Sequence, residues 1–216
     1  MTPQPLRIAG IVLAVGVAIG LVAVVAGLPL ADVGSADRTI WVADRLGLWI
    51  GLVLVLLASP ALYVRQYREA GVLGMVGFAL IFIGTVGGLA FTAETVALLV
   101  PWVYDKATCT IGCNLLSTTD GPPLLGIVIP GTDLLTGAGF IAFGFATARA
   151  AVLPRAAGYV MAGAGAILMI GAVAPSDALF LIGRLAVLVG FVAAAWMGLA
   201  LATADAAADA TSPRRG

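Results

Sequence analysis

Apolar residues run through this chain in six long stretches that are separated by short polar segments. A helix needs about 20 mainly apolar residues to cross about 30 Å of hydrocarbon, and each stretch has roughly that length. The pattern therefore predicts an all-α fold, a polytopic bundle of six transmembrane helices. The predicted spans are 8–30, 46–64, 71–100, 124–148, 156–174 and 178–202. They form a single transmembrane domain, 1–203, followed by a polar cytoplasmic tail, 204–216, that is predicted to be disordered.

The first stretch has a second interpretation, a cleaved signal peptide. Arg7 would be its charged start, and residues 33–36 (VGSA) resemble a small-residue cleavage site. The apolar stretch 8–30 is longer than the roughly 7–15 residues of a usual signal-peptide core. A retained span is therefore the favoured interpretation.

Composition supports a membrane protein and excludes several kinds of chemistry. Hydrophobic residues make up 62% of the 216 positions and charged residues 10%, whereas a soluble domain has about 25% charged residues. The chain has no histidine, which excludes histidine-ligated metals and a Ser-His catalytic pair. The formal net charge is zero, so no overall field attracts nucleic acid. We predict no metal, no cofactor and no nucleic-acid partner; the predicted partner is the lipid bilayer.

The positions of Lys and Arg predict the orientation, because cytoplasmic segments of membrane proteins carry an excess of both. With the N-terminus inside, the inner segments hold seven of the eleven basic residues and the outer loops hold three. This imbalance predicts a multi-pass protein of the cell (plasma or inner) membrane with both termini in the cytoplasm. The inner residues are Arg7, Arg65, Arg68, Arg149, Arg155, Arg214 and Arg215, and the outer ones are Arg38, Arg45 and Lys106.

Three ionisable residues lie within the predicted spans, where charge is costly: Glu94, Asp133 and Arg184. At a rise of about 1.5 Å per residue, all three fall in the outer half of the bilayer, where the arginine can reach one or both carboxylates. We predict that they form an intramembrane charge cluster. The favoured role is structural, an ion pair that fixes helix register. The alternative is a proton or ion relay, or a counter-charge for a polar substrate.

Asp133 has two predicted positions. If the fourth span begins near Leu124, Asp133 lies about 15 Å below the outer end of its helix. If Pro130-Gly131 breaks the helix, Thr132 is the N-cap and Asp133 lies in the first turn, where a carboxylate is favoured. Both versions place a polar position beneath the outer surface.

Two cysteines, Cys109 and Cys113, lie in the second outer loop. Disulfides persist outside the cytoplasm, so we predict a bond between them that staples this loop. A redox centre is the weaker interpretation, because thiol exchange typically uses a CxxC spacing.

Two glycine pairs have the small-x-x-x-small spacing that lets transmembrane helices approach closely, Gly16 with Gly20 and Gly84 with Gly88. In a chain with 28 glycines such matches arise readily by chance. We interpret them as packing positions and not as a signal for dimers.

The chain over residues 46–201 resembles the small uncharacterised six-helix integral membrane proteins of prokaryotes. The matching motifs are residues 62–66 (LYVRQ) before the glycines 71, 74 and 77, the turn 153–155 (LPR), and residues 196–198 (WMG). The resemblance implies a helical bundle in the cell membrane and supplies no activity or catalytic residue.

These observations predict a non-enzymatic accessory or interaction bundle with an intramembrane charge cluster. The first alternative is a small-solute or proton-coupled transporter that uses Glu94, Asp133 and Arg184 in an outward-facing cavity. A thiol-disulfide membrane oxidoreductase based on Cys109 and Cys113 is a more remote alternative. No catalytic residue is predicted.

Overall fold

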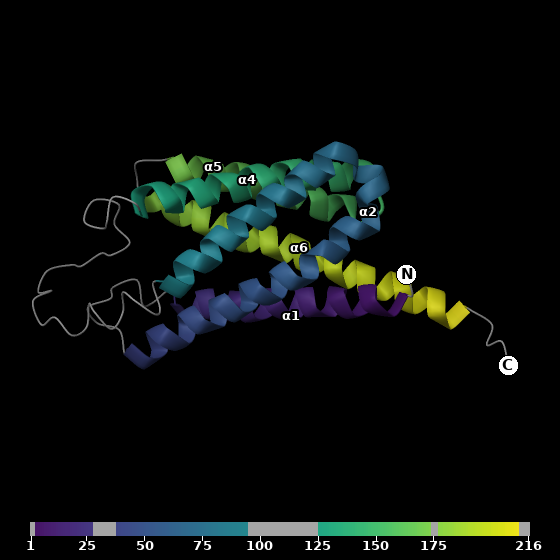
Figure 1. Cartoon of the computed structure of the whole chain (residues 1–216), viewed down its shortest axis with the longest axis horizontal. Coiled ribbons are helices and arrows are strands. Elements are labelled where there is room, and N and C mark those ends of the chain that lie inside the picture. Colours follow the sequence, from purple (N-terminus) through teal and green to yellow (C-terminus); the bar gives the residue numbers. More distant parts are fainter. Residues whose placement is uncertain (1–2, 28–37, 95–124, 174–176, 212–216) are drawn as a thin grey trace, which may run out of the picture.

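The computed structural model describes residues 3–27, 38–94, 125–173 and 177–211, which are helical almost throughout (Figure 1). This confirms the all-α class. The helices are α1 (Pro3–Gly27), α2 (Arg38–Glu94), α4 (Leu125–Ala150), α5 (Arg155–Val173) and α6 (Asp177–Thr211). Four segments of the described chain are long and apolar enough to cross a membrane, which indicates a membrane protein. They are Gln4–Ala23, Leu46–Gly88, Arg155–Val173 and Leu185–Thr203.

The predicted count of six helices is wrong, because the described residues form five. The predicted span 46–64 and the described part of the predicted span 71–100, which ends at Glu94, both belong to α2. The polar segment between them, residues 65–70, continues the helix instead of forming a separate turn. Its Arg, Gln, Glu and Ala residues are good helix formers, so polarity alone does not end the helix.

Helix α2 bends sharply at Gly71, which divides it into a first arm, 38–70, and a second arm, 72–94 (Figure 1). The backbone of Gly71 has φ 59° and ψ −155°, a conformation that is accessible almost exclusively to glycine. Across the bend, the rings of Tyr63 and Phe78 stack with their centroids 5.2 Å apart. The second arm therefore runs back toward the end of the bundle at which α2 begins, and it packs on α4 and not on α1.

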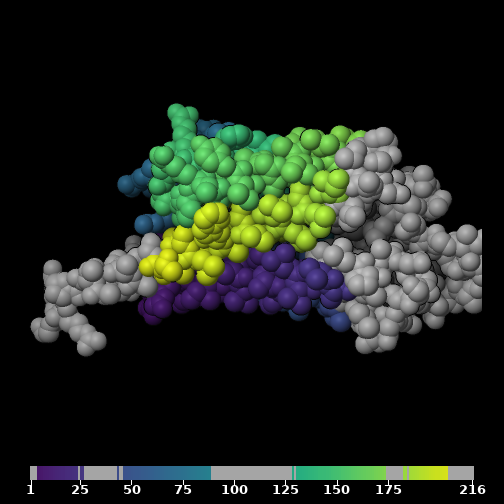
Figure 2. Space-filling model, turned by 180° about the vertical axis from the view of Figure 1, so that it is seen from behind, coloured from purple at the N-terminus to yellow at the C-terminus, as the bar shows by residue number. Residues whose placement is uncertain are grey.

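The five helices pack side by side as a ring, in the order α1, α2, α4, α5, α6 and back to α1, which we call the closed order. Each helix therefore has two principal neighbours. The first arm of α2 packs on α1, and its second arm packs on α4, so α2 joins the two halves of the bundle. Seen from the opposite side, α6 lies between α1 and the α4–α5 pair (Figure 2).

Two helix ends bear on the sequence predictions. α4 begins at Leu125 and continues through Pro130 and Gly131, so Thr132 lies inside the helix and is not its N-cap. α6 continues to Thr211, so the segment predicted to be a disordered tail from residue 204 is helical as far as that residue. The alanines of this segment favour helix and explain the extension.

The core contains fully buried side chains from α1, α4, α5 and α6, including Leu13, Phe140, Met161 and Met197. Phe140 packs edge-on against Phe191, with the ring centroids 5.8 Å apart. Because Leu13 of α1 belongs to this core, the first helix is an integral part of the bundle.

Candidate functional site

The residues of the predicted charge cluster belong to three helices, each of which has one terminus at the same end of the bundle (Figure 1). Glu94 is the last residue of α2, Asp133 lies in α4, and Arg184 lies in α6. Figure 1 shows that α2 ends at the same end of the bundle at which α4 and α6 begin. Asp133 is half-buried, about 12 Å along α4 from its first residue. The side chains of Glu94 and Arg184 lie outside the described set, so the cluster stays a prediction.

The predicted disulfide lies outside the described residues. Cys109 and Cys113 belong to segment 95–124, so their pairing also stays a prediction. Within the described parts of the chain, no three acidic, cysteine or histidine side chains gather into a potential metal site.

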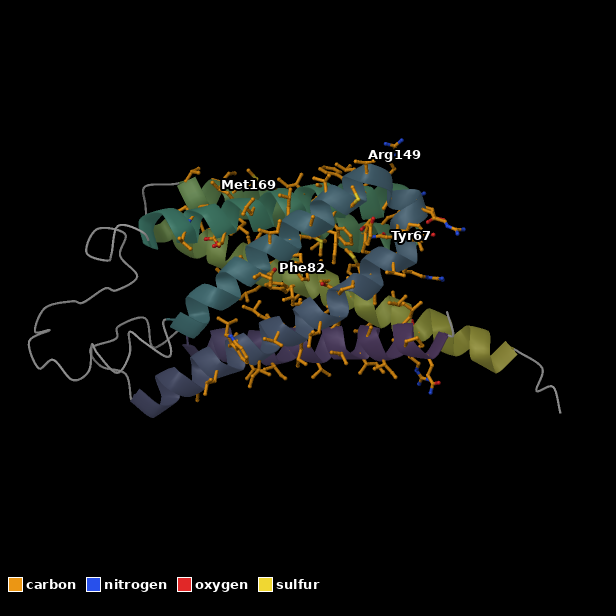
Figure 3. All side chains as sticks on the ribbon, viewed as in Figure 1. Tyr67, Phe82, Arg149 and Met169 are labelled. Atoms are coloured by element: carbon orange, nitrogen blue, oxygen red, sulfur yellow. The ribbon has the colours of Figure 1, made fainter. Side chains whose placement is uncertain are left out.

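The opposite end of the bundle carries a group of exposed arginines. Figure 3 shows side-chain nitrogen atoms gathered at the end that holds Tyr67 and Arg149. The Arg68 Nε donates a hydrogen bond of 2.8 Å to the Tyr67 hydroxyl, and the guanidinium lies 5.5 Å from the centre of the Tyr67 ring. An aromatic ring with a polar tip beside a long basic side chain is typical of a membrane–water interface. The arginines exposed in this group are Arg7, Arg65, Arg68, Arg149 and Arg155.

A buried polar link connects α2 to α4 near the arginine end. The Gln66 Nε2 donates a hydrogen bond of 2.8 Å to the Thr147 Oγ1, and both residues have no exposed surface. The Gln66 Oε1 has no hydrogen-bond partner. A buried amide in an apolar bundle is costly unless it is bonded, so this link ties the bend of α2 to one position on α4.

Sequence reasoning missed this link, because it placed Gln66 in a solvated turn. Once the segment 65–70 is read as helix, Gln66 falls on the same face as Leu62 and Ala70, which are both buried. This helical spacing is the sequence signal from which the burial of Gln66 could have been predicted.

The α4–α5 interface is built on glycines whose backbones touch those of the other helix. A Cβ atom added at Gly144 would lie 2.5 Å from the carbonyl oxygen of Gly158, and one added at Gly165 would lie 2.5 Å from that of Gly137. Real Cβ atoms do not come this close to a carbonyl oxygen. Any larger residue would force α4 and α5 apart.

Glycines make similarly close contacts in three of the other four interfaces of the closed order, whereas in the α5–α6 interface a Cβ atom added at Gly183 would lie 3.1 Å from the Cα atom of Gly171. The predicted packing role is confirmed for Gly16, which meets α2, and for Gly84, which meets Thr136 of α4. At Gly20 and Gly88, the second residues of the two predicted pairs, an added Cβ atom would meet nothing within 4 Å. Helices can therefore approach to backbone contact all round the bundle. The contacts pair Gly16 with Gly51, Gly77 with Gly139, Gly171 with Gly183, and Gly10 with Gly198.

The buried side chains in the described part of the chain are mainly apolar, and the polar ones among them are uncharged. The latter are Gln66, Thr85, Thr136 and Thr147. Their arrangement can hold helices in register through hydrogen bonds, but a glutamine and three threonines supply neither a strong base nor a nucleophile activated by one.

Comparison of the chain with protein-family models, with curated proteins and with solved structures gives no match. Fold and packing are therefore the basis for a functional proposal.

Proposed function

We propose that this protein is a non-enzymatic bundle of the cell membrane that serves as an accessory or interaction protein. The observation that carries the proposal is that four of the five interfaces of the closed order have glycine contacts too close for a Cβ atom, and that the α5–α6 interface has a looser one at Gly183 and Gly171. Transporters move one group of helices against another, and backbones locked together at glycines oppose such sliding. A close-packed bundle instead presents fixed helix faces to lipid and to neighbouring membrane proteins.

The proposal includes an orientation with both termini in the cytoplasm. The exposed arginines lie at the end of the bundle where α1 begins and α6 ends (Figures 1 and 3). Because basic residues accumulate on the cytoplasmic side of membrane proteins, this end is assigned to the cytoplasm.

Accessibility of the interior tests the proposal against the transporter alternative. In a background with Cys109→Ser and Cys113→Ser, single cysteines are introduced at the buried positions Ala164 and Ala186, which are 3% and 4% exposed. Ala156→Cys, on the exposed surface of α5, is the matched control. Each purified variant is treated with a hydrophilic maleimide, once folded and once denatured in SDS, and labelling is quantified by mass spectrometry.

We expect Ala156→Cys to react in both states, and Ala164→Cys and Ala186→Cys to react only after denaturation. Ala186 lies about 3 Å farther along α6 than Arg184, so Ala186→Cys tests the interior at the depth to which an outward-facing cavity would bring water. Rapid labelling of folded Ala186→Cys would overturn the sealed bundle and favour the transporter.

A further inference from the structure

A shallow apolar groove lies on the outside of the bundle, between α1 and the first arm of α2. Its volume is about 260 Å³. Ile8 and Leu57 are 56% and 72% exposed, so the groove opens outward, where a membrane-spanning bundle meets lipid. It is lined by Pro5, Ile8, Ala9 and Val12 of α1 and by Leu57 and Ala58 of α2.

The size of the residues along the α1–α2 interface explains where the groove forms. Deeper in the bundle the two helices touch, and a Cβ atom added at Gly51 would lie 2.8 Å from the carbonyl oxygen of Gly16. Closer to the start of α1, the small side chains of Ala9 and Ala58 leave the surface hollow between the larger Ile8 and Leu57. The groove therefore has an apolar floor and apolar walls, and it is closed at its deep end by the glycine contact.

The lining of the groove is apolar, and helical spacing places the basic residue Arg65 beyond the end of the groove that lies at the start of α1. Arg65 follows Ala58 by seven residues, which is two helical turns and about 10 Å, so the two lie on the same face of α2. The Arg65 side chain is exposed and belongs to the arginine end of the bundle. Because α1 and the first arm of α2 run in opposite directions, Arg65 lies at the level of the first turns of α1, where Pro5 begins the groove.

We propose that this groove binds one anionic phospholipid, with an acyl chain against the apolar lining and the headgroup phosphate bound by Arg65. The apolar lining matches the chemistry of an acyl chain, and the arginine lies where the chain joins its charged headgroup. A guanidinium forms strong, often bidentate hydrogen bonds with phosphate oxygens. A net negative headgroup is preferred to a zwitterionic one, because the latter carries a cationic group that Arg65 repels.

The test is native mass spectrometry of the full chain released from nanodiscs that contain equal parts of phosphatidylglycerol and phosphatidylcholine with identical acyl chains. We expect one retained phosphatidylglycerol, preferred over phosphatidylcholine by about fivefold, as about 1 kcal/mol per basic residue implies. Arg65→Gln should lower the preference, while Arg7, the exposed arginine between Pro5 and Ile8 of the groove, stays in place. Arg155→Gln removes an exposed arginine of the same end on α5, and it should leave the preference unchanged.

Two variants test the groove itself. Ala9→Trp fills it, and Leu57→Asn makes its exposed wall polar with little effect on the core. Both should lower retention of phosphatidylglycerol, while Ala156→Trp, on the exposed surface of α5, should not. Equal retention of both lipids by the unaltered chain, or equal losses in Arg65→Gln and Arg155→Gln, would overturn the site. Unchanged binding in correctly folded Ala9→Trp and Leu57→Asn would do the same.

Discussion

The side chain of Gln66 donates a hydrogen bond to that of Thr147 across 81 positions of sequence, and neither residue is exposed. The main chain of Thr147 is also engaged, because its carbonyl oxygen accepts a hydrogen bond of 3.1 Å from the Ala151 N–H at the end of α4. Thr147 thus links α4 to the bend of α2 through its side chain, and its carbonyl oxygen accepts one of the last hydrogen bonds of α4.

Loss of this link should destabilise the bundle. Thr147→Val keeps the shape of the side chain but leaves the buried amide of Gln66 unpaired. We expect the free energy of unfolding to fall by about 1–2 kcal/mol, measured by SDS titration in micelles. Gln66→Leu combined with Thr147→Val should cost less than the sum of the single changes. Thr203→Val is the control, since that exposed hydroxyl bonds only within its own helix; an equal loss there would contradict the assignment.

The bend of α2 should depend on the backbone freedom of Gly71. A Cβ atom there meets nothing within 4 Å, so the cost of Gly71→Ala is one of conformation and not of space. We expect a loss of about 1–3 kcal/mol in the same titration. At Gly131, which is helical and also has open space around a Cβ, alanine should be neutral or stabilising. Equal behaviour of the two variants would mean that the bend does not require glycine.

The α4–α5 contact predicts a second pair of glycine variants. A Cβ atom at Gly158 would lie 2.6 Å from the carbonyl oxygen of Gly144, whereas one at Gly163 in the same helix meets nothing. We expect Gly158→Ala to lower the thermal midpoint, with a loss of about 1–3 kcal/mol, and Gly163→Ala to raise it slightly. Circular dichroism in detergent measures both. An unaffected Gly158→Ala would show that the two helices are not locked together.

The end of α4 offers a stabilising change. Ala151 has φ 57°, a left-handed conformation at the helix terminus that normally favours glycine. Ala151→Gly should therefore raise the free energy of unfolding by about 0.5–1 kcal/mol. Ala156→Gly, within the first turn of α5, should lower it by a similar amount. A decrease in both variants would contradict the left-handed conformation of Ala151.

The charge cluster can be tested by paired substitutions. If Arg184 pairs with Asp133, Arg184→Leu removes an ion pair from a half-buried carboxylate, and we expect a loss of about 1–3 kcal/mol, between the values for exposed and buried pairs. Addition of Asp133→Leu should restore part of that stability. Arg155→Leu, at an exposed site, serves as the control. Full stability of Arg184→Leu would exclude a structural ion pair.

The apolar stretches predicted the helical class well, because helices are the simplest way to satisfy backbone hydrogen bonds within a membrane. The predicted helix count was wrong at residues 65–70, because this polar segment was interpreted as a connection between two helices, although its residues have good helix propensity and are helical. The same error placed Gln66 in solvent and hid its contact with Thr147. At Pro130-Gly131 the sequence left two positions for the start of α4, and the structure places it at Leu125.

By itself, the sequence determined that the chain is helical and belongs in a membrane. These properties follow from residue type and order, which act locally along each helix. Only the tertiary structure decided that α2 bends at Gly71 to join two neighbours, that Gln66 meets Thr147, and that close glycine contacts form four of the five interfaces. Such contacts depend on which helix faces come together, and a nearly uniform apolar pattern does not distinguish one face from another.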